Sequence, residues 1–280
     1  MNKIILAITS FILLTSCLKD DSPKDYTSEN EEDIQKYLTD NNLQATKDEY
    51  GVYYVIEEEG TGTQPETSNV VKLNYKGRVL NGKVFSKAED KPAYLQIEKI
   101  IQGLGFGLSH FKAGGSGKII IPSKLGYGNV SFTNIPEGSV LVFDIELIDI
   151  FSNIEEANDD EIMEYLAEEE ITEYTKTSSG LYYIIEQEGT GETPEPTDNV
   201  TVAYKGYFTS GTVFDESSVS GVSFDLKEVI EGWTEGITYF KKGGSGKLFI
   251  PSNLGYGSNN NRGIPGGSVL IFDIKLVSIN

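Results

Sequence analysis

One pattern is written twice along this chain, and the second copy lies 129 residues after the first. The matched pairs include Tyr54/Tyr183, Tyr75/Tyr204, Phe85/Phe214, Ile101/Ile230, Pro122/Pro251, Tyr127/Tyr256, Ile135/Ile264 and Phe143/Phe272. Self-similarity at a fixed period indicates two copies of one folding unit. The copies differ at two positions of chemical interest. Asp215 corresponds to Ser86, and Trp233, the only tryptophan, corresponds to Leu104.

Length, charge and cysteine count limit what such a chain can be. With 280 residues, each copy has enough chain to bury a hydrophobic core of its own. The formal net charge of −20 argues against nucleic acid as a partner, because phosphates would be repelled. The single cysteine, Cys17, excludes an internal disulfide.

The first 17 residues have the composition of an export signal. Lys3 precedes an apolar run over residues 4–14, which is too short to cross a bilayer as a mature helix. Residues 14–17 (Leu-Thr-Ser-Cys) resemble the lipobox of bacterial lipoproteins. This resemblance implies cleavage before Cys17 and lipid on that cysteine as the link to a membrane. It places the protein at the bacterial outer membrane, on the periplasmic or the exposed side. An ordinary signal peptide and a buried N-terminal segment are the alternatives.

A polar stretch follows the cysteine. Residues 18–21 (Leu-Lys-Asp-Asp) resemble the export tag of surface lipoproteins of the Bacteroidetes, although a solvated tether explains them equally well. Residues 19–32 contain almost no apolar side chains, and such composition cannot support a packed core. The sequence therefore predicts a flexible tether over residues 17–30.

Hydrophobic periodicity predicts the same order of elements in both copies. Each begins with a short amphipathic helix, with apolar faces made of Ile34, Tyr37, Leu38 and Leu43 in one copy and Ile162, Tyr165, Leu166 and Ile171 in the other. Period-2 strands and hairpin turns at residues 81–82 and 210–211 follow. One helical segment is expected over residues 100–111 and again over 229–240. Antiparallel strands around one central helix make an α+β unit.

Three motifs that invite a chemical interpretation do not support one. Gly-Gly-Ser-Gly-Lys at 114–118 and 243–247 lacks the glycine spacing and the Ser or Thr of a phosphate loop. No strand pattern directly precedes the glycines at 103, 105 and 107, so they are not a dinucleotide fingerprint. His110 is the only histidine and has no ligand cluster around it. We expect no cofactor, no metal site and no hydrolytic triad.

A set of aromatic and branched residues at fixed spacing remains, best preserved in the second copy. Large aromatics at strand spacing usually fill cores. Core packing does not account for Asp215, an acid placed directly after an apolar strand residue. It also fails for Tyr256, because the surrounding Leu-Gly-Tyr-Gly is typical of a loop.

Five ordered blocks of the second copy resemble the FKBP family of peptidyl-prolyl isomerases. They are residues 202–206 (Val-Ala-Tyr-Lys-Gly), 211–215 (Gly-Thr-Val-Phe-Asp), 229–233 (Val-Ile-Glu-Gly-Trp), 250–257 and 264–274. The resemblance covers residues 70–150 and 199–280 almost continuously. It implies an α+β fold of two tandem FKBP-like domains, each a half-open antiparallel sheet wrapped around a short helix and preceded by a short amphipathic helix. The expected boundaries are a signal peptide at 1–16, the tether at 17–30, domain 1 at 31–150, a linker at 151–158 and domain 2 at 159–280.

The same resemblance implies a catalytic pocket in domain 2. Carried over residue by residue, the pocket has Trp233 as its floor, Tyr204, Phe214 and Phe272 as walls, Val229 and Ile230 along one side, Tyr256 as a hydroxyl from the loop, Ile264 at the rim and Asp215 as a buried hydrogen-bonding brace. The Ile230 backbone N–H is expected to be free to donate to a substrate carbonyl. Val222 stands where the family usually has an aromatic residue.

The corresponding site in domain 1 is expected to bind substrate weakly. It keeps Tyr75, Phe85, Ile100, Ile101, Tyr127, Ile135 and Phe143, with Leu104 in place of the indole. Replacing an indole by an isobutyl group removes a flat contact surface.

These features predict a peptidyl-prolyl cis-trans isomerase that acts on Xaa-Pro bonds of exported proteins, mainly through domain 2. Its partners are proline-containing polypeptides, and the family's macrolide-type inhibitors are possible ligands. The alternative is a non-catalytic chaperone or scaffold lipoprotein that binds proline-containing peptides.

Overall fold

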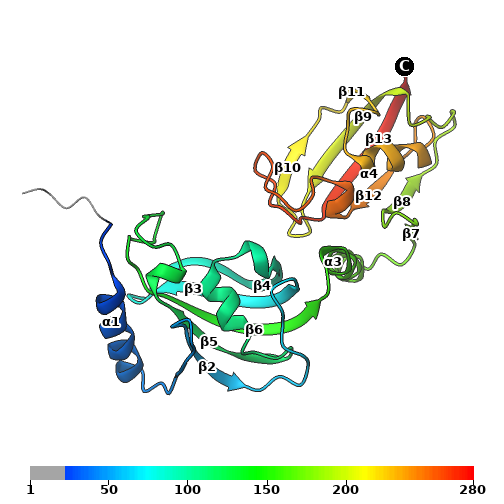
Figure 1. The fold of residues 1–280 in the computed structure, drawn as a ribbon. Coiled ribbons are helices and arrows are strands. Elements are labelled where there is room, and N and C mark those ends of the chain that lie inside the picture. Colours follow the sequence, from blue (N-terminus) through cyan, green and yellow to red (C-terminus); the bar gives the residue numbers. More distant parts are fainter. Residues whose placement is uncertain (1–22) are drawn as a thin grey trace, which may run out of the picture.

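The computed structural model describes residues 23–280, so the expected signal peptide and Cys17 lie outside the described residues. Two units of the same kind follow one another along the chain (Figure 1). The first contains α1 (Thr27–Asp40), β1 (Thr46–Lys47), β2 (Tyr53–Glu58), β3 (Val70–Val79), β4 (Val84–Gln96), η1 (Ile97–Lys99), α2 (Gln102–Leu108), β5 (Gly115–Ile121), η2 (Ser123–Leu125) and β6 (Leu141–Phe151). Within residues 23–280, no helix has the length and apolar character needed to cross a membrane.

The second unit repeats this order with one strand divided. It contains α3 (Ile154–Glu168), β7 (Thr175–Lys176), β8 (Tyr182–Gln187), β9 (Asn199–Tyr207), β10 (Val213–Glu216), β11 (Val222–Asp225), α4 (Glu231–Gly236), η3 (Ile237–Tyr239), β12 (Ser245–Ile250), η4 (Ser252–Leu254) and β13 (Leu270–Ile279). The α+β architecture of two tandem FKBP-like domains is therefore confirmed.

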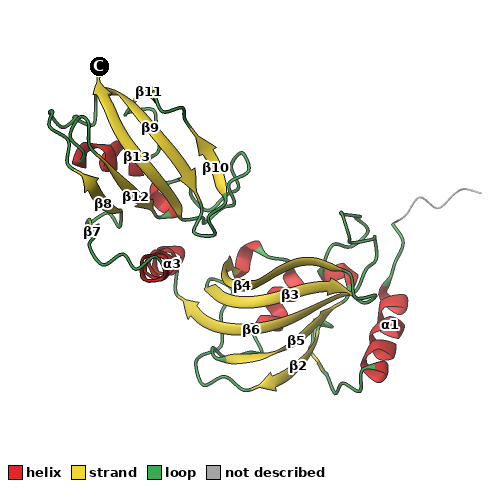
Figure 2. Cartoon of the chain, turned by 180° about the vertical axis from the view of Figure 1, so that it is seen from behind, coloured by secondary structure: helices red, strands yellow, loops and turns green. Residues whose placement is uncertain are grey.

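Each domain is built on one antiparallel sheet (Figure 2). The strand order is β1-β2-β5-β6-β3-β4 in domain 1 and β10-β9-β13-β12-β8-β7 in domain 2, where β11 also pairs with β9. The last strand of each domain lies in the centre of its sheet, so the chain must be complete to its carboxyl end before the sheet closes.

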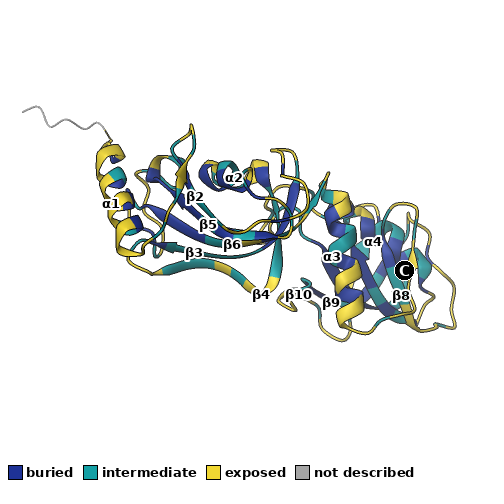
Figure 3. Ribbon diagram, turned by 90° about the horizontal axis from the view of Figure 1, so that it is seen from below, coloured by how far each residue is buried: buried dark blue, intermediate teal, exposed yellow. Residues whose placement is uncertain are grey.

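The two faces of each sheet bury different cores because side chains alternate along a strand. In β5, Ile119 and Ile121 pack into the core under α2, whereas Ile120 packs into the core under α1. The two helices accordingly lie on opposite faces of the sheet (Figure 3). Domain 2 repeats this division, with Leu248 and Ile250 on the α4 side and Phe249 on the α3 side.

Glycines bring the inner helix close to the sheet. A Cβ atom on Gly103 would lie 2.2 Å from Ile121, and one on Gly107 would lie 2.3 Å from Ile119. Gly232 and Gly236 face Ile250 and Leu248 in the same way in domain 2. These glycines therefore serve helix packing rather than ligand binding.

The expected tether is shorter than predicted at its carboxyl end. Helix α1 begins at Thr27, so residues 27–30 belong to the helix and not to the tether of 17–30. Asn30 is 2% exposed, and its side chain bonds the backbone of Gly138 and Ser123. These long-range contacts order a stretch whose composition alone predicts disorder.

The expected linker over 151–158 is also wrong in detail. Strand β6 ends at Phe151 and α3 begins at Ile154, so the helix includes half of the acidic stretch. The Asn153 side chain accepts the Glu156 N–H, and the Glu156 carboxylate accepts the Ser152 N–H. Acidic residues in the first turn of a helix stabilise it, so these charges start a helix instead of forming a linker.

Helix α3 contacts both domains. Its residues Ile162 and Leu166 pack into the core of domain 2. Its other side meets domain 1, where the Lys72 ammonium lies 2.8 Å from Asp160 and 2.6 Å from Glu164. Lys72 is only 6% exposed, although its place in a period-2 strand suggests a solvated side chain. The ion pairs compensate for its burial.

Glu161 lies on α3 in the same contact region. Burial raises the pKa of Glu161 to about 7, and Glu164 and Asp160 act in the same direction. The Thr209 hydroxyl donates to its carboxylate at 2.6 Å, which with Lys91 opposes the increase in pKa. A carboxyl whose folded-state pKa is raised favours folding below its unfolded pKa, and this contribution is lost as the pH rises through about 7.

Replacing Glu161 by Gln should therefore stabilise the protein only at high pH. At pH 8 we expect the free energy of unfolding to rise by roughly 1–2 kcal/mol, a value reduced because the group is partly exposed. At pH 5 the change should be close to zero. Urea unfolding at both pH values measures this, with Glu169→Gln as an exposed control on the same helix. Equal effects at the two pH values would contradict the raised pKa.

Candidate functional site: an aromatic enclosure on helix α4

Three aromatic rings surround the Trp233 indole in domain 2. Tyr204 from β9, Phe224 from β11 and Phe272 from β13 have their ring centroids 5.1, 5.2 and 5.3 Å from the indole. All three rings stand steeply to its plane, at 88°, 76° and 81°. Phe214 extends this wall, at 5.5 Å from Phe272. Trp233 is 4% exposed, so the indole forms the bottom of a narrow, mostly apolar enclosure.

Asp215 fixes the tyrosine of this wall. The Tyr204 hydroxyl donates a 2.7 Å hydrogen bond to the Asp215 carboxylate. Burial, followed by this hydrogen bond and the negative charge of Asp215, raises the pKa of Tyr204 to about 12. The phenol therefore stays protonated at neutral pH. Asp215 itself is exposed, which corrects the expectation of a buried brace: the acid holds the tyrosine from the solvent side.

Two hydrogen-bond donors at this site have no acceptor among residues 23–280. The Trp233 Nε1 atom is buried without a partner. The Ile230 N–H, at the start of α4, is likewise unused, whereas the Ile230 carbonyl accepts the N–H groups of Trp233 and Thr234. Buried unpaired donors are costly and rare, so two of them beside one enclosure indicate a place for an external acceptor.

The loop after β12 contributes the rim. It carries Tyr256, which is 41% exposed, and Ile264, which is buried in the α4 core. Asn158 of α3 holds both ends of this loop, because its amide donates to the Gly267 carbonyl at 2.9 Å and accepts the Ser252 N–H at 2.8 Å. Asn158 is completely buried, and Asn30 makes the same two contacts in domain 1.

The first domain has a related but altered site. Phe85 lies 5.6 Å from Phe143 and 6.3 Å from Tyr127, both edge to face, and Leu104 occupies the place of the indole with 4% exposure. The Tyr75 hydroxyl shares a 2.8 Å hydrogen bond with Ser86 in place of a carboxylate.

Backbone structure also distinguishes the two sites. Strand β4 runs without interruption from Val84 to Gln96. In domain 2 the equivalent segment divides into β10 and β11, joined by a turn in which Gly221 has a φ of +77°. Phe224 lies directly after this interruption, where domain 1 has Leu95.

The structure brings most of the predicted residues together. Tyr204, Phe214, Val229, Ile230, Trp233, Ile264 and Phe272 belong to one apolar cluster, as do Tyr75, Phe85, Ile100, Ile101, Leu104, Tyr127, Ile135 and Phe143 in domain 1. Val222 is 44% exposed on β11 and lies outside this cluster. The sequence analysis missed Phe208, 5.0 Å from Phe214, and Asn158. Asn158 was detectable, because the helical repeat pairs it with Asn30.

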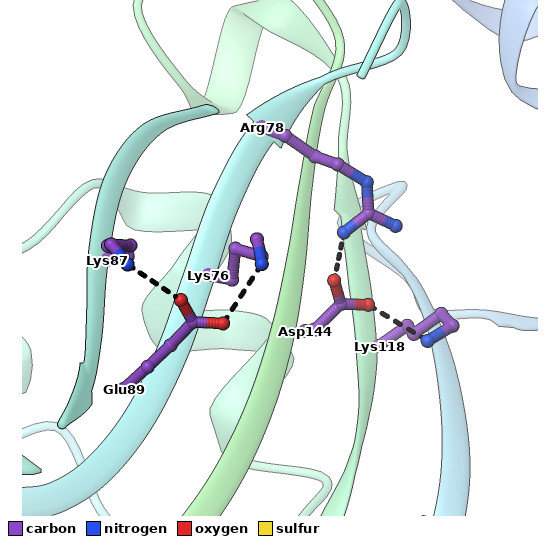
Figure 4. Close-up of polar contacts among 6 residues, drawn as sticks. All are labelled: Lys76, Arg78, Lys87, Glu89, Lys118 and Asp144. Carbon is purple, nitrogen blue, oxygen red and sulfur yellow. Dashed lines mark hydrogen bonds and ion pairs between the residues drawn. The ribbon is translucent and has the colours of Figure 1, made fainter. Parts of the chain in front are cut away.

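Charged groups on the outer face of domain 1 form a separate network. Figure 4 shows Arg78 and Lys118 meeting at Asp144, and Lys76 and Lys87 meeting at Glu89. Burial alone would raise the pKa of Asp144, but hydrogen bonds from Lys118 and Arg78 lower it below its usual value. Asp144 and the inward-facing Phe143 are successive residues of β6, so the network lies on the opposite face from the aromatic site.

His110 has a structural environment. Its ring stacks on Tyr54 at 4.1 Å, and its Nε2 atom lies 3.3 Å from Asp48. Tyr239 stacks on Tyr183 at the equivalent place in domain 2.

Comparison with known proteins decides the family. The profile described as FKBP-type peptidyl-prolyl cis-trans isomerase matches residues 61–148 and again 190–277. The chain belongs to this family. Both matched segments run from the glycine-rich end of the second long strand to the last strand, so each FKBP domain includes a complete aromatic site.

Curated relatives of this FKBP protein include isomerases named FkpA. The FkpA of Buchnera aphidicola subsp. Schizaphis graminum is 53% identical over 108 residues, which are 38% of this chain and 43% of that protein. The FkpA of Escherichia coli (strain K12) is 48% identical over 107 residues, 37% of this chain and 40% of that protein. The match thus spans less than half the length of these relatives.

Solved structures give the same picture. The crystal structure of FkpA from Escherichia coli aligns over 45% of this FKBP chain and 62% of its own, with 38% identity and a TM-score of 0.40. The three FKBP domains of wheat FKBP73 align over 85% of this chain and 99% of theirs, with 22% identity and a TM-score of 0.37.

Removing the Asn158 amide should loosen the rim loop of the second FKBP domain. In Asn158→Ala, the buried Ser252 N–H and the Gly267 carbonyl lose their partners, at a cost of about 2–3 kcal/mol. Amide hydrogen exchange over residues 253–266 should accelerate. The matched variant Asn30→Ala should accelerate exchange over residues 124–137 instead. Unchanged exchange around Tyr256 in Asn158→Ala would show that this contact does not hold the loop.

Proposed function

We propose that this protein is a prolyl isomerase that acts on Xaa-Pro bonds of exported proteins, mainly through the aromatic enclosure of domain 2. The observation that carries the proposal is the Trp233 indole enclosed by three rings beside two unused hydrogen-bond donors. A core built only for stability would satisfy or omit these donors.

The reaction needs no acid, base or bond cleavage. Rotation about a peptide bond meets a barrier of roughly 18–20 kcal/mol, because twisting removes amide resonance. The planar amide is the more polar form and is better stabilised by water than the twisted one. An apolar enclosure therefore disfavours the planar ground state relative to the transition state. A rate increase of about 10⁴–10⁵ requires only about 5–7 kcal/mol.

Each part of the enclosure has a role in this proposal. The proline ring packs among Tyr204, Phe214 and Phe272, with Trp233 below it and Val229 beside it. The Ile230 N–H donates to a carbonyl of the substrate and so fixes the peptide while the bond rotates. Tyr256 and Ile264 cover the rim. Asp215 keeps the Tyr204 ring in place through the 2.7 Å hydrogen bond. Macrolide-type inhibitors of the family would occupy the same enclosure.

The first domain serves as a weak substrate-binding site. Leu104 offers less surface than an indole, and Ser86 leaves Tyr75 bound to a neutral hydroxyl rather than to a carboxylate. Both changes weaken the enclosure without removing its apolar character. A non-catalytic role in holding proline-containing peptides fits this domain better than the second.

Making domain 2 resemble domain 1 should abolish most of the activity. In the full chain, Trp233→Leu with Asp215→Ser should lower kcat/KM for a proline tetrapeptide by about tenfold or more. A protease-free isomerisation assay measures this, since unfolded variants would otherwise be digested.

The matched pair Phe85→Ala and Phe214→Ala controls for general damage. We expect less than about a twofold loss for the first and a large loss for the second. A larger loss from Phe85→Ala would assign the activity to domain 1. Protection of an unfolded client that survives Phe214→Ala would favour the non-catalytic chaperone.

We further propose that lipid on Cys17 anchors the protein to the bacterial outer membrane, facing the periplasm or the exterior. The support is the sequence alone, an apolar run ending in Leu-Thr-Ser-Cys and followed by a charged stretch. Several acyl chains on one residue give a firm anchor, because each buried CH₂ contributes about 0.8 kcal/mol.

Cys17→Ser should release the protein from membranes. In the producing bacterium, the unaltered chain should incorporate labelled palmitate and sediment with membranes, whereas the variant should do neither. Ser16→Ala, which keeps a small residue before the cysteine, is the matched control. Sedimentation of Cys17→Ser with membranes would exclude lipid at this residue as the anchor.

A further inference from the structure

Domain 1 has a second hollow, separate from its aromatic site. Its volume is about 560 Å³, within the range of pockets that hold ligands or several side chains. It lies beside α2 and is lined by Tyr50, Pro65, Ile97, Ile100, Gly105 and Phe106. We call it the α2 groove. It shares only Ile100 with the aromatic set described above.

An exposed aromatic stack forms one wall of the α2 groove. The rings of Tyr50 and Phe106 are 4.0 Å apart and nearly parallel, and Tyr50 is 50% exposed. Domain 2 shows that the fold does not need this stack. Its equivalent residues are Ser179 and Glu235, whose side chains form a 2.6 Å hydrogen bond. The first domain thus exposes aromatic surface where its copy has an ordinary polar pair.

Gly105 makes room for the α2 groove. Glycine weakens a helix by about 1 kcal/mol relative to alanine, so its presence needs a reason. For Gly103 and Gly107 that reason is packing against β5, because a Cβ there would overlap Ile121 or Ile119. A Cβ on Gly105 would lie 3.2 Å from the Ile97 side chain, a contact that a small shift relieves. Domain 2 has Thr234 here, whose hydroxyl donates to the Leu226 carbonyl at 2.6 Å.

The rim of the α2 groove is acidic. Glu66 and Glu98 line it, and both are exposed. Lys99 lies 3.9 Å from Glu98 and offsets part of that charge. In domain 2 the residue equivalent to Glu98 is Lys227. An apolar hollow flanked by carboxylates complements an apolar side chain next to a cationic one. The net charge of −20 adds attraction for basic segments and repels phosphate-rich partners.

We propose that the α2 groove binds an extended polypeptide segment in which a bulky apolar side chain stands next to lysine or arginine. The apolar side chain inserts between the Tyr50–Phe106 stack and Ile97, and the cation pairs with Glu66 or Glu98. Proline is not required. The first domain then holds an unfolded chain at a point away from both aromatic sites.

A proline-free peptide tests this site independently of the isomerase proposal. The probe is fluorescein-labelled Gly-Ser-Lys-Leu-Phe-Lys-Ser-Gly amide, titrated with the full described chain and followed by fluorescence anisotropy. We expect saturable binding that weakens with salt. Exchanging both lysines of the peptide for glutamate should weaken binding by about tenfold or more.

Variants that copy domain 2 provide the decisive comparison. Tyr50→Ser with Phe106→Glu, and separately Gly105→Thr, should each raise the Kd by about tenfold or more. Both introduce residues that the same fold already carries in its second copy. Isomerase activity and the unfolding temperature should stay close to those of the parent, which shows that the variants fold. Phe85→Ala should leave the Kd unchanged.

Three results would overturn the proposal. The first is an unchanged Kd in both groove variants. The second is a loss of peptide binding in Phe85→Ala, which would place the peptide in the aromatic site. The third is a dimer of the parent chain that becomes a monomer in Tyr50→Ser with Phe106→Glu, since the groove would then join two copies of this chain. Loss of isomerase activity alone concerns domain 2 and leaves the groove proposal standing.

Discussion

The close contact between a glycine-faced helix and a sheet determines the rest of each domain. Gly103 and Gly107 in α2, and Gly232 and Gly236 in α4, leave no room for a Cβ atom against the isoleucine and leucine side chains beneath them. The helix therefore sits low on the sheet, and the residue after the first glycine points into the core. That residue is Leu104 in one domain and Trp233 in the other, so helix packing alone decides where the indole lies.

A few residues on this common frame separate the two domains. The indole of Trp233 is large enough to meet three rings from different strands, whereas Leu104 fills a core position. Asp215 gives Tyr204 a charged partner, and the divided β10–β11 segment places Phe224 against the indole. Domain 1 gains other features, the Tyr50–Phe106 stack and the space above Gly105. The copies have diverged toward different contacts rather than one simply losing function.

The sequence was informative where periodicity or internal repetition carried the signal. The order of strands, the inner helices and the clustering of the aromatic residues all follow from residues that recur 129 positions apart. It was misleading where distant contacts override composition. Residues 27–30 and 154–158 are polar and acidic, yet Asn30 and Asn158 bind loops more than ninety residues away and order both helices. The burial of Lys72 depends on α3, which no local pattern in β3 could reveal. The roles of the site residues remain predictions from the family resemblance.

The Lys72 ion pairs have a consequence for motion. A swivel of the second domain about residues 152–153 would pull Asp160 and Glu164 away from an ammonium that has almost no access to water. Leaving such a charge unpaired costs several kcal/mol, so states with the contact broken are sparsely populated. The molecule accordingly behaves as a stiff two-headed clamp, in which the separation of its peptide-holding surfaces is set in advance. A client that spans both heads gains from this pre-set spacing, since its second attachment occurs at high effective concentration.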